Sequence, residues 1–132
     1  MDASAWVVAL VDDGPQGDAS RRSLTSDLDW AAPAHTPLEV LRTLRRYESS
    51  GTLSPTAATV LVEGVLAAQV RYAVPDEDLL AYVWRHRHNL SPDDAPYVAL
   101  AARCGVALVT ADDRLARAAQ ALGVATTVPA DS

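Results

Sequence analysis

The chain has 132 residues, of which 49% are hydrophobic and 21% charged, and its formal net charge at pH 7 is −6. These values indicate one soluble globular domain over residues 1–132, and the negative charge argues against a strong overall attraction for nucleic acid. Apart from histidine, every basic residue is an arginine. The absence of lysine excludes a Walker-type phosphate loop and Schiff-base chemistry.

Three features predict a cytoplasmic protein without membrane spans. Asp2 stands where a signal peptide would carry positive charge, so we expect no export. No apolar run approaches the roughly 20 residues that a membrane span requires. Cys104 is the only cysteine and has apolar neighbours, which indicates a buried thiol in a reducing compartment.

Apolar periodicity and turn residues predict alternating helices and strands along the whole chain. Helices are expected at 4–12, 16–26, 36 to just before Gly51, 54–68, 76–87, 93–103 and from the Asp112–Asp113 pair to Leu122. Strands are expected at 28–32, 70–74, 106–110 and 124–128. Short strands separated by helices favour an α/β fold with a parallel sheet between helix layers, in which sites form beyond the carboxyl ends of the strands.

Local patterns predict how several of these helices begin, end and pack. Residues 36–39 (TPLE) have the pattern of a capping box with proline in the first turn. Asn89, in a left-handed conformation, and Gly105 are expected to end the helices that precede them. The apolar periodicity predicts buried faces formed by Leu38, Leu41, Leu44 and Tyr47 in one helix and by Val60, Leu61, Val65 and Leu66 in the next.

Two pairs of adjacent aspartates, Asp93–Asp94 and Asp112–Asp113, each precede a predicted helix. Taken singly, each acid is explained as a helix cap, because carboxylates favour the unpaired N–H groups of a first turn. Pro96 must lie in a first turn, so the helix is expected to begin near Asp93. Asp93 then serves as the cap, and the carboxylate of Asp94 is left free. By the same reasoning, only one of Asp112 and Asp113 is needed as a cap.

Four of the acids are predicted to meet at one edge of the sheet. Asp2 and Asp112 lie at the expected ends of strands, and Glu39 and Asp94 open helices that begin on the same edge. Carboxylates gathered there repel one another unless a cation is present. A set of oxygen ligands without Cys or His suits Mg²⁺ or Mn²⁺. Capping and metal binding remain compatible explanations.

The sequence resembles PIN-domain ribonucleases, specifically the toxins of VapBC toxin–antitoxin pairs. The resemblance runs nearly end to end and rests on DASAWVVAL at 2–10, TPLEVLRTLRR at 36–46 and RHNLSPDDAPYVALAARCGVALVTADDRLARA at 87–118. It implies a three-layer α/β/α fold with a short central parallel sheet. It also implies a catalytic metal site formed by Asp2, Glu39, Asp94 and Asp112, with Asp113 as a further ligand and Ser4 and Thr110 supporting the acids.

By this resemblance, the expected activity is Mg²⁺- or Mn²⁺-dependent endonucleolytic hydrolysis of RNA. The expected partners are a small antitoxin, whose basic residue lies against the acids, and a second copy of the chain, which packs against the helix at 54–68. RNA contacts are expected from Arg42, Arg46 and Arg87, with Arg45, Arg85 and His88 nearby. Pairing of Glu39 with Arg42 and complementation of helix dipoles explain the same arginines equally well.

The chain departs from the family at its start. Related proteins usually carry a few apolar residues before the first aspartate, whereas here Met1 is followed at once by Asp2. We expect that the start was assigned too late or that the sequence was trimmed. We expect a short apolar N-terminal segment to raise both stability and metal affinity.

The sequence leaves three alternative functions. A catalytically inactive PIN fold would bind RNA or a partner without cleavage. VALVDDG at 8–14 imitates the opening of a receiver-like signalling domain, but such a domain needs a lysine that the chain lacks. His86 and His88 suggest a metal-free acid–base ribonuclease, although residues two apart on a helix point in different directions.

Overall fold

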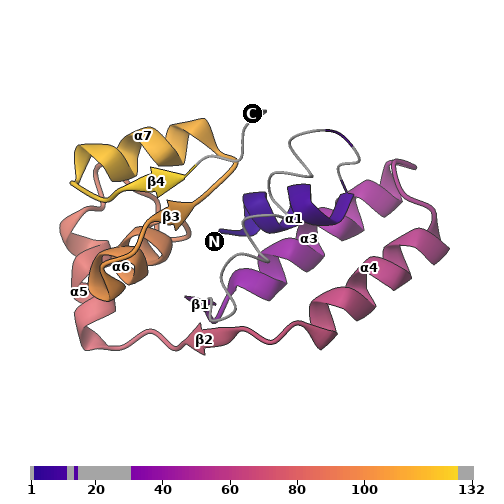
Figure 1. Cartoon of the computed structure of the whole chain (residues 1–132), viewed down its shortest axis with the longest axis horizontal. Coiled ribbons are helices and arrows are strands. Elements are labelled where there is room, and N and C mark those ends of the chain that lie inside the picture. The colour runs from indigo at the N-terminus through magenta and orange to yellow at the C-terminus, as the bar shows by residue number, and fades with distance from the viewer. Residues whose placement is uncertain (1, 12–13, 15–30, 128–132) are drawn as a thin grey trace.

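The computed structural model describes residues 2–11, 14 and 31–127. In chain order, these residues form α1 (Ala3–Val11), β1 (Ala31–Pro33), α3 (Thr36–Ser49), α4 (Pro55–Ala67), β2 (Arg71–Ala73), α5 (Glu77–Arg85), α6 (Ala95–Cys104), β3 (Leu108–Val109), α7 (Asp113–Ala121) and β4 (Thr126–Thr127) (Figure 1). The predicted alternation of helices and strands is confirmed. The helix expected at 16–26 lies outside the described residues, as does most of the strand expected at 28–32.

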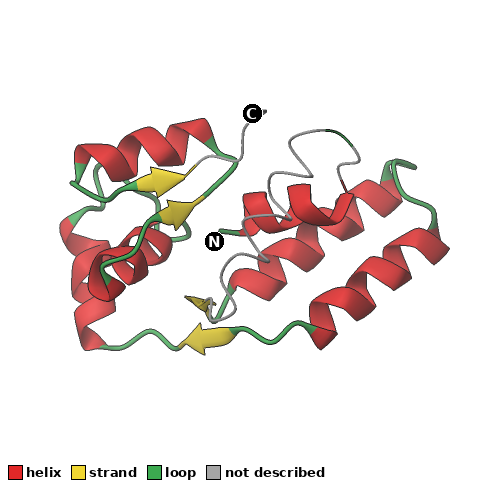
Figure 2. Cartoon of the chain, viewed as in Figure 1, coloured by secondary structure: helices red, strands yellow, loops and turns green. Residues whose placement is uncertain are grey.

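The strands are short and form parallel pairs. β1 pairs with β2, with Ala32 opposite Tyr72, and β3 pairs with β4, with Leu108 opposite Thr126. The expected α/β fold with parallel strands between helices is confirmed, although the described residues form two two-stranded sheets instead of one continuous sheet (Figure 2).

The backbone of Asp2 lies on the free edge of β3. Its N–H donates to the carbonyl of Val109 at 2.9 Å, whereas the N–H groups of Leu108 and Thr110 donate toward β4. Backbone groups of successive strand residues point to opposite sides, so Asp2 and β4 lie on opposite edges of β3. The start of α1 is thereby fixed beside the carboxyl end of β3.

Two hydrophobic cores lie on either side of this junction. One is formed by α1, α3 and α4 and contains Trp6, Val40, Leu44 and Val65. The other is formed by α5, α6, α7, β3 and β4 and includes the buried residues Leu90, Tyr97, Val98, Leu108, Leu115 and Val124. Figure 1 shows the two groups of helices at opposite ends of the molecule, with the start of α1 between them.

The buried faces of α3 and α4 differ from the prediction. Leu38 is 66% exposed, whereas Val40 and Leu44 are buried. The buried stripe of α3 follows i, i+4 spacing through Thr36, Val40 and Leu44, which rotates Leu38 toward solvent. On α4, Val65 is buried as expected, but Val60 and Leu66 are exposed. Periodicity located these helices correctly and misplaced part of their inner faces.

Three other local predictions are wrong. The capping box predicted at 36–39 does not form, because the N-cap of α3 is His35 and no side chain caps this helix. Cys104 is exposed because it is the last residue of α6, beyond the part of that helix that packs into the core. Asn89 is not left-handed, since among the described residues only glycines have positive φ. Gly105, with φ of 65°, ends α6 as predicted. None of the described helices is both long enough and apolar enough to cross a membrane.

The contrast between Leu44 and Leu38 tests this packing. Leu44→Ala removes a side chain that is 1% exposed and should lower the free energy of unfolding by about 2–5 kcal/mol. Leu38→Ala is the matched control on the same helix and should change it by less than about 0.5 kcal/mol. Urea unfolding followed by circular dichroism measures both. Equal losses in the two variants would contradict the observed orientation of α3.

Candidate active site

Asp2 is a buried carboxylate at the junction of the two cores. It is 4% exposed, and both of its oxygens accept hydrogen bonds. Oδ1 accepts from Ser4 Oγ at 2.7 Å and from the N–H of Ala5 at 3.1 Å, and Oδ2 accepts from Thr110 Oγ1 at 2.6 Å. Hydrogen bonds to a charged acceptor are stronger than those between neutral groups, so they offset part of the cost of burial.

Ser4 and Thr110 connect Asp2 to the segment that follows β3. Their hydroxyl oxygens lie 3.2 Å apart, and Ser4 Oγ accepts from the N–H of Ala111 at 3.0 Å. Thr110 Oγ1 accepts from the N–H of Asp112 at 3.0 Å. The two hydroxyl residues therefore contact both the first acid and the backbone that positions Asp112.

Asp112 is the N-cap of α7. Its Oδ1 accepts from the N–H groups of Arg114 and Leu115 at 3.0 and 3.2 Å. This capping leaves Oδ2 available on the other side of the carboxylate. Asp113 lies in the first turn of α7 and is exposed. The expectation that only one acid of this pair is needed as a cap agrees with the structure.

Asp94 is the N-cap residue of α6, but its side chain makes no capping hydrogen bond. The prediction that Asp93 caps this helix is wrong, because Ala95 is the first helical residue and Ser91 Oγ accepts from the N–H of Asp94 at 3.1 Å. The carboxylate of Asp94 is free of capping, as expected. It accepts from Arg114 Nη2 at 3.1 Å, and the same nitrogen lies 3.6 Å from Asp112 Oδ2.

Glu39 lies in the first turn of α3 among buried polar groups. His35 Nε2 is 2.8 Å from Glu39 Oε1, in a geometry that makes an ion pair only when the ring is protonated. Thr36 Oγ1 and Tyr97 Oη are buried and have no hydrogen-bond partner of good geometry within the described structure, and the buried Glu39 Oε1 makes its contact with His35 without the geometry of a hydrogen bond. Such atoms are rare in folded proteins and mark places that bind ordered water or an ion.

Burial and mutual repulsion change the acidity of these groups. Burial raises the pKa of the Asp2 carboxyl despite its three hydrogen bonds. Burial also raises the pKa of Glu39; His35 opposes this shift, and the charges of Asp93 and Asp94 add to it. Burial raises the pKa of Tyr97 as well, with the charges of Glu39 and Asp2 acting in the same direction.

These interactions connect the four acids to one another through shared neighbours. Thr110 contacts both Asp2 and Asp112. Arg114 bridges Asp112 and Asp94. Asp94 acts electrostatically on Glu39, and Tyr97 is influenced by both Glu39 and Asp2. We call Asp2, Glu39, Asp94 and Asp112 the acidic ring.

The chemistry of the acidic ring fits a hard divalent cation. It offers carboxylate oxygens, among them the buried Glu39 Oε1, which lies beside His35, and those of the uncapped Asp94, and such ligands suit Mg²⁺ or Mn²⁺. Within residues 2–11, 14 and 31–127, however, no three Asp, Glu, His or Cys side chains are already arranged to hold a metal ion. Arg114 lies between two of the acids, so it would have to move before an ion could bind both.

The expected RNA-contacting arginines are all exposed. Arg42 and Arg46 lie on α3, and Arg46 lies 5.8 Å from the ring of Tyr47. Arg87 follows α5, donates to the carbonyl of Trp84 at 2.7 Å and stacks 4.3 Å from its ring. His86 packs at 4.4 Å against Tyr82 and His88 is exposed. Within the described structure these two histidines do not form a pair.

Sequence reasoning missed three residues around the acidic ring. His35 precedes Glu39 by four residues, a spacing that brings side chains together in a helical turn. Tyr97 follows Asp94 by three residues and packs edge-on against His35 at 5.3 Å. Arg114 directly follows the second aspartate pair, and a cation in a first turn is unusual enough to have been noticed.

Comparison with known proteins agrees with this architecture. The PIN domain family matches residues 1–121. Ribonuclease VapC3 of Mycobacterium tuberculosis is 37% identical over 119 residues, which cover 89% of this chain and 85% of that protein. VapC ribonuclease Mb0985 of Mycobacterium bovis is 36% identical over 130 residues, 98% of this chain and 97% of that protein. Ribonuclease VapC1 of M. tuberculosis is 34% identical, with 89% and 88% covered.

An α/β fold with acids gathered at the carboxyl end of short parallel strands defines a PIN-type domain. The chain belongs to the PIN-domain family, as a member of its VapC type. The expectation drawn from the sequence motifs is confirmed. The relatives do not by themselves assign a role to any residue of the acidic ring.

The raised pKa of Asp2 predicts how stability depends on pH in the presence of a chelator. Because the folded protein favours the protonated carboxyl, the wild-type free energy of unfolding should lose this contribution as pH rises from about 4 through the raised pKa. Asp2→Asn removes the titrating group. Urea unfolding at a series of pH values should show that the free energy of unfolding of the variant increases relative to that of the wild type as pH rises. A trend in the opposite direction would contradict the pKa shift.

Proposed function

We propose that this protein is a metal-dependent endoribonuclease and the toxin component of a type II toxin–antitoxin pair that acts in the cytoplasm. The observation that carries this proposal is the acidic ring, whose members come from both ends of the chain and are connected through Thr110, Arg114 and Tyr97. Its relatives are named ribonucleases. Four acids at one place are unfavourable without a cation, and that instability is what a divalent ion would relieve.

Asp2, Glu39, Asp94 and Asp112 would hold Mg²⁺ or Mn²⁺, with Asp113 within reach as a further ligand. When bound there, the ion would activate water for attack on a phosphodiester and stabilise the charge that develops on the phosphate. Ser4 and Thr110 would fix the orientation of Asp2 through the hydrogen bonds already described. The buried carboxylate of Asp2 would then present its one remaining lone-pair site, on Oδ2, to the ion.

A chain with net charge −6 must hold RNA through local basic surfaces. Arg42 and Arg46 project from α3, the helix that begins beside Glu39. Arg87 stacks on the exposed ring of Trp84. An aromatic face next to a guanidinium is suited to stack a base and bind the adjoining phosphate. We assign RNA contacts to these three arginines.

Cleavage distinguishes the nuclease from an inactive PIN fold that only binds RNA. Asp94→Asn should reduce Mg²⁺-dependent RNA cleavage by about a hundredfold or more, because even groups that only support metal ligands contribute about 10- to 100-fold. Asp93→Asn is the matched control. It removes a neighbouring exposed carboxylate and should retain nearly full activity. Cleavage assays with a labelled RNA and a chelator control measure both variants.

The two alternatives give different results in this assay. Equal cleavage by wild type and Asp94→Asn would remove the basis for the metal-nuclease assignment. RNA binding without cleavage by the wild type would favour the inactive PIN fold. The receiver-like alternative is disfavoured by the structure, because residues 8–11 belong to helix α1 and not to a strand.

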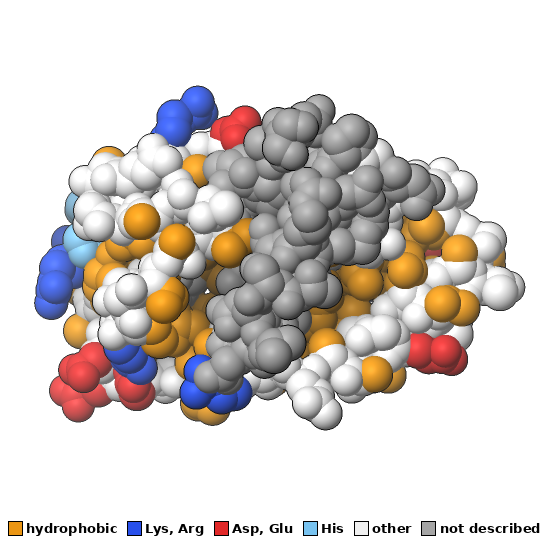
Figure 3. All heavy atoms as spheres, in the orientation of Figure 1, with side chains coloured by type: hydrophobic (Ala, Val, Ile, Leu, Met, Phe, Trp, Pro, Cys, Tyr) orange, Lys and Arg blue, Asp and Glu red, His pale blue; other side chains and the backbone are white. Residues whose placement is uncertain are grey.

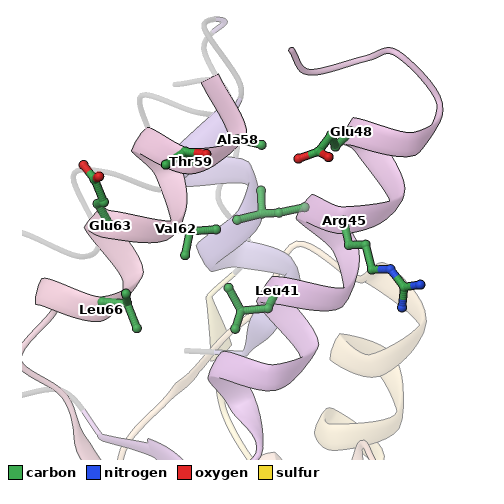
Figure 4. Close-up of a pocket in the computed structure, with 9 residues that line it drawn as sticks. Leu41, Arg45, Glu48, Ala58, Thr59, Val62, Glu63 and Leu66 are labelled. Atoms are coloured by element: carbon green, nitrogen blue, oxygen red, sulfur yellow. The ribbon is translucent and has the colours of Figure 1, made fainter. Parts of the chain in front are cut away.

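An apolar groove between α3 and α4 suits the antitoxin. It has a volume of about 490 Å³, and its lining includes Leu41, Val62 and Leu66 together with Glu48 and Glu63. Figure 4 shows Leu41 and Val62 pointing toward one another across the groove, and Figure 3 shows hydrophobic side chains exposed beside α4. Arg45 lines the groove as well, together with the two glutamates. An amphipathic helix with basic residues would match the apolar floor and Glu48 and Glu63.

The position of the groove supports one partner that reaches both sites. α3 carries Glu39 in its first turn, and Leu41 begins the groove lining two residues later. Residues two apart on a helix point in different directions, so a separate segment of the same partner would have to carry a basic side chain to the acidic ring, where it would occupy the place of the metal. We assign the groove to the antitoxin, and we assign self-association of the toxin to other exposed residues of α4.

A charge placed in the groove tests this assignment. Leu66 lines the groove and is 75% exposed. Leu66→Glu places a carboxylate there and should weaken binding of the co-expressed antitoxin by about tenfold or more. Val60→Glu is the control, on the same helix, 60% exposed and outside the groove. Calorimetric titration measures both affinities. Loss of toxin self-association with unchanged antitoxin affinity in Leu66→Glu would reassign the groove to a second copy of the chain.

A further inference from the structure

Arg114 occupies an unusual place in the fold. It is the second residue of α7, where the positive end of the helix dipole disfavours a cation. Its side chain is 71% exposed and is not held by the core. The interactions that keep it there are with carboxylates: Nη2 is 3.1 Å from Asp94 Oδ2 and 3.6 Å from Asp112 Oδ2. The helix dipole and burial therefore do not explain the position of the Arg114 side chain, whereas its contacts with Asp94 and Asp112 do.

The oxygens that Arg114 approaches are those left over by the fold. Asp112 uses Oδ1 to cap α7, which leaves Oδ2 for a cation. The side chain of Asp94 makes no capping bond at all. A divalent ion shared by these two acids would need Asp112 Oδ2, which Arg114 approaches, and its charge would repel the guanidinium that bridges the same two carboxylates. The guanidinium and the ion therefore cannot both make their closest contacts.

The balance between the two cations can be judged from general magnitudes. Ion pairs of exposed side chains contribute about 0.2–1 kcal/mol, because solvent screens them and both side chains lose freedom. The long arginine side chain can leave without opening a cavity. Arg114 is thus held strongly enough to neutralise the acids in the absence of metal and weakly enough to be displaced.

We propose that Arg114 competes with the divalent cation for Asp94 and Asp112, holding the two carboxylates together in the metal-free protein and leaving them when the ion binds. This inference rests on the proposed metal-dependent function. It makes Arg114 a positioning residue that sets how much metal is needed to assemble the site. No other residue of the described structure bridges two acids of the ring with a positive charge.

The test is a direct measurement of metal affinity. Mn²⁺ is titrated into the full-length protein, and free Mn²⁺ is followed by electron paramagnetic resonance. Arg114→Gln should lower the Mn²⁺ dissociation constant by about 1.4- to fivefold, the range that corresponds to an exposed ion pair. Arg117→Gln is the matched control. It lies one turn further along α7, is exposed, and changes the net charge equally, so it should leave the dissociation constant within experimental error.

A second measurement separates competition from a general effect of charge. In chelator, Arg114→Gln should have a lower midpoint of thermal unfolding than Arg117→Gln, because Asp94 and Asp112 then repel one another unscreened. With saturating Mn²⁺ the difference between the variants should disappear. A difference of the same size with and without Mn²⁺ would assign Arg114 a purely structural role and overturn the proposal.

The outcomes distinguish this inference from the function on which it rests. Saturable Mn²⁺ binding with equal dissociation constants in wild type and Arg114→Gln would overturn the role of Arg114 and leave the metal site intact. Weaker binding in Arg114→Gln would also overturn it, since the arginine would then assist the ion. An absence of saturable binding in all three proteins would contradict the metal-dependent function itself, and the competition with it.

Discussion

The hydrogen bond between the carboxylate of Asp2 and the hydroxyl of Thr110, 2.6 Å long, is the interaction on which the site depends. It joins residues that are 108 positions apart in the chain and brings the start of α1 to the carboxyl end of β3. A buried carboxylate is costly unless its oxygens accept hydrogen bonds. The same requirement that stabilises Asp2 therefore fixes where the first acid lies relative to Asp112.

The two hydrophobic cores explain why the acidic ring forms at their junction. Each core is closed by its own helices, so the junction is where polar groups remain near water while still being partly buried. Glu39 comes from the core of α1, α3 and α4, and Asp94 and Asp112 come from the core of α5, α6 and α7. A cation bound among them would contact both halves of the molecule. Metal binding and the relative position of the two cores are thus expected to be thermodynamically linked.

Much of the fold follows from local patterns in the sequence. The capping serine and proline of α4, the aspartates before α5 and α7 and the left-handed Gly105 define helix ends through interactions that reach only a few residues. The errors occur where the answer depends on distant contacts. The face that α3 buries is set by Trp6 and Val65, which are remote in sequence, and periodicity alone placed Leu38 on the wrong side. Asp93 was expected to cap α6, but the helix begins at Ala95, with Asp94 as its N-cap residue. The hydroxyl of Ser91, and not the carboxylate of Asp93, accepts a hydrogen bond from the N–H of Asp94.

The acidic ring could be predicted as a set of residues but not as a geometry. Charge pattern and strand order indicate that Asp2, Glu39, Asp94 and Asp112 approach one another, since carboxyl ends of parallel strands share an edge. Charge pattern and strand order do not show which basic side chains lie between the acids. His35 and Arg114 supply this information, and their positions in the sequence do not show which acids they contact, because the contacts of Arg114 with Asp94 join separate helices.

A single electrostatic requirement now connects the parts of the proposed function. The acids of the ring need positive charge nearby, and three sources can provide it: the side chain of Arg114, a divalent ion and a basic residue of the antitoxin. Because all three would use the same carboxylate oxygens, occupancy by one lowers the affinity for the others, and this coupling is reciprocal. The metal-free, active and inhibited states would then differ mainly in which cation occupies the ring, with little change required in the surrounding fold.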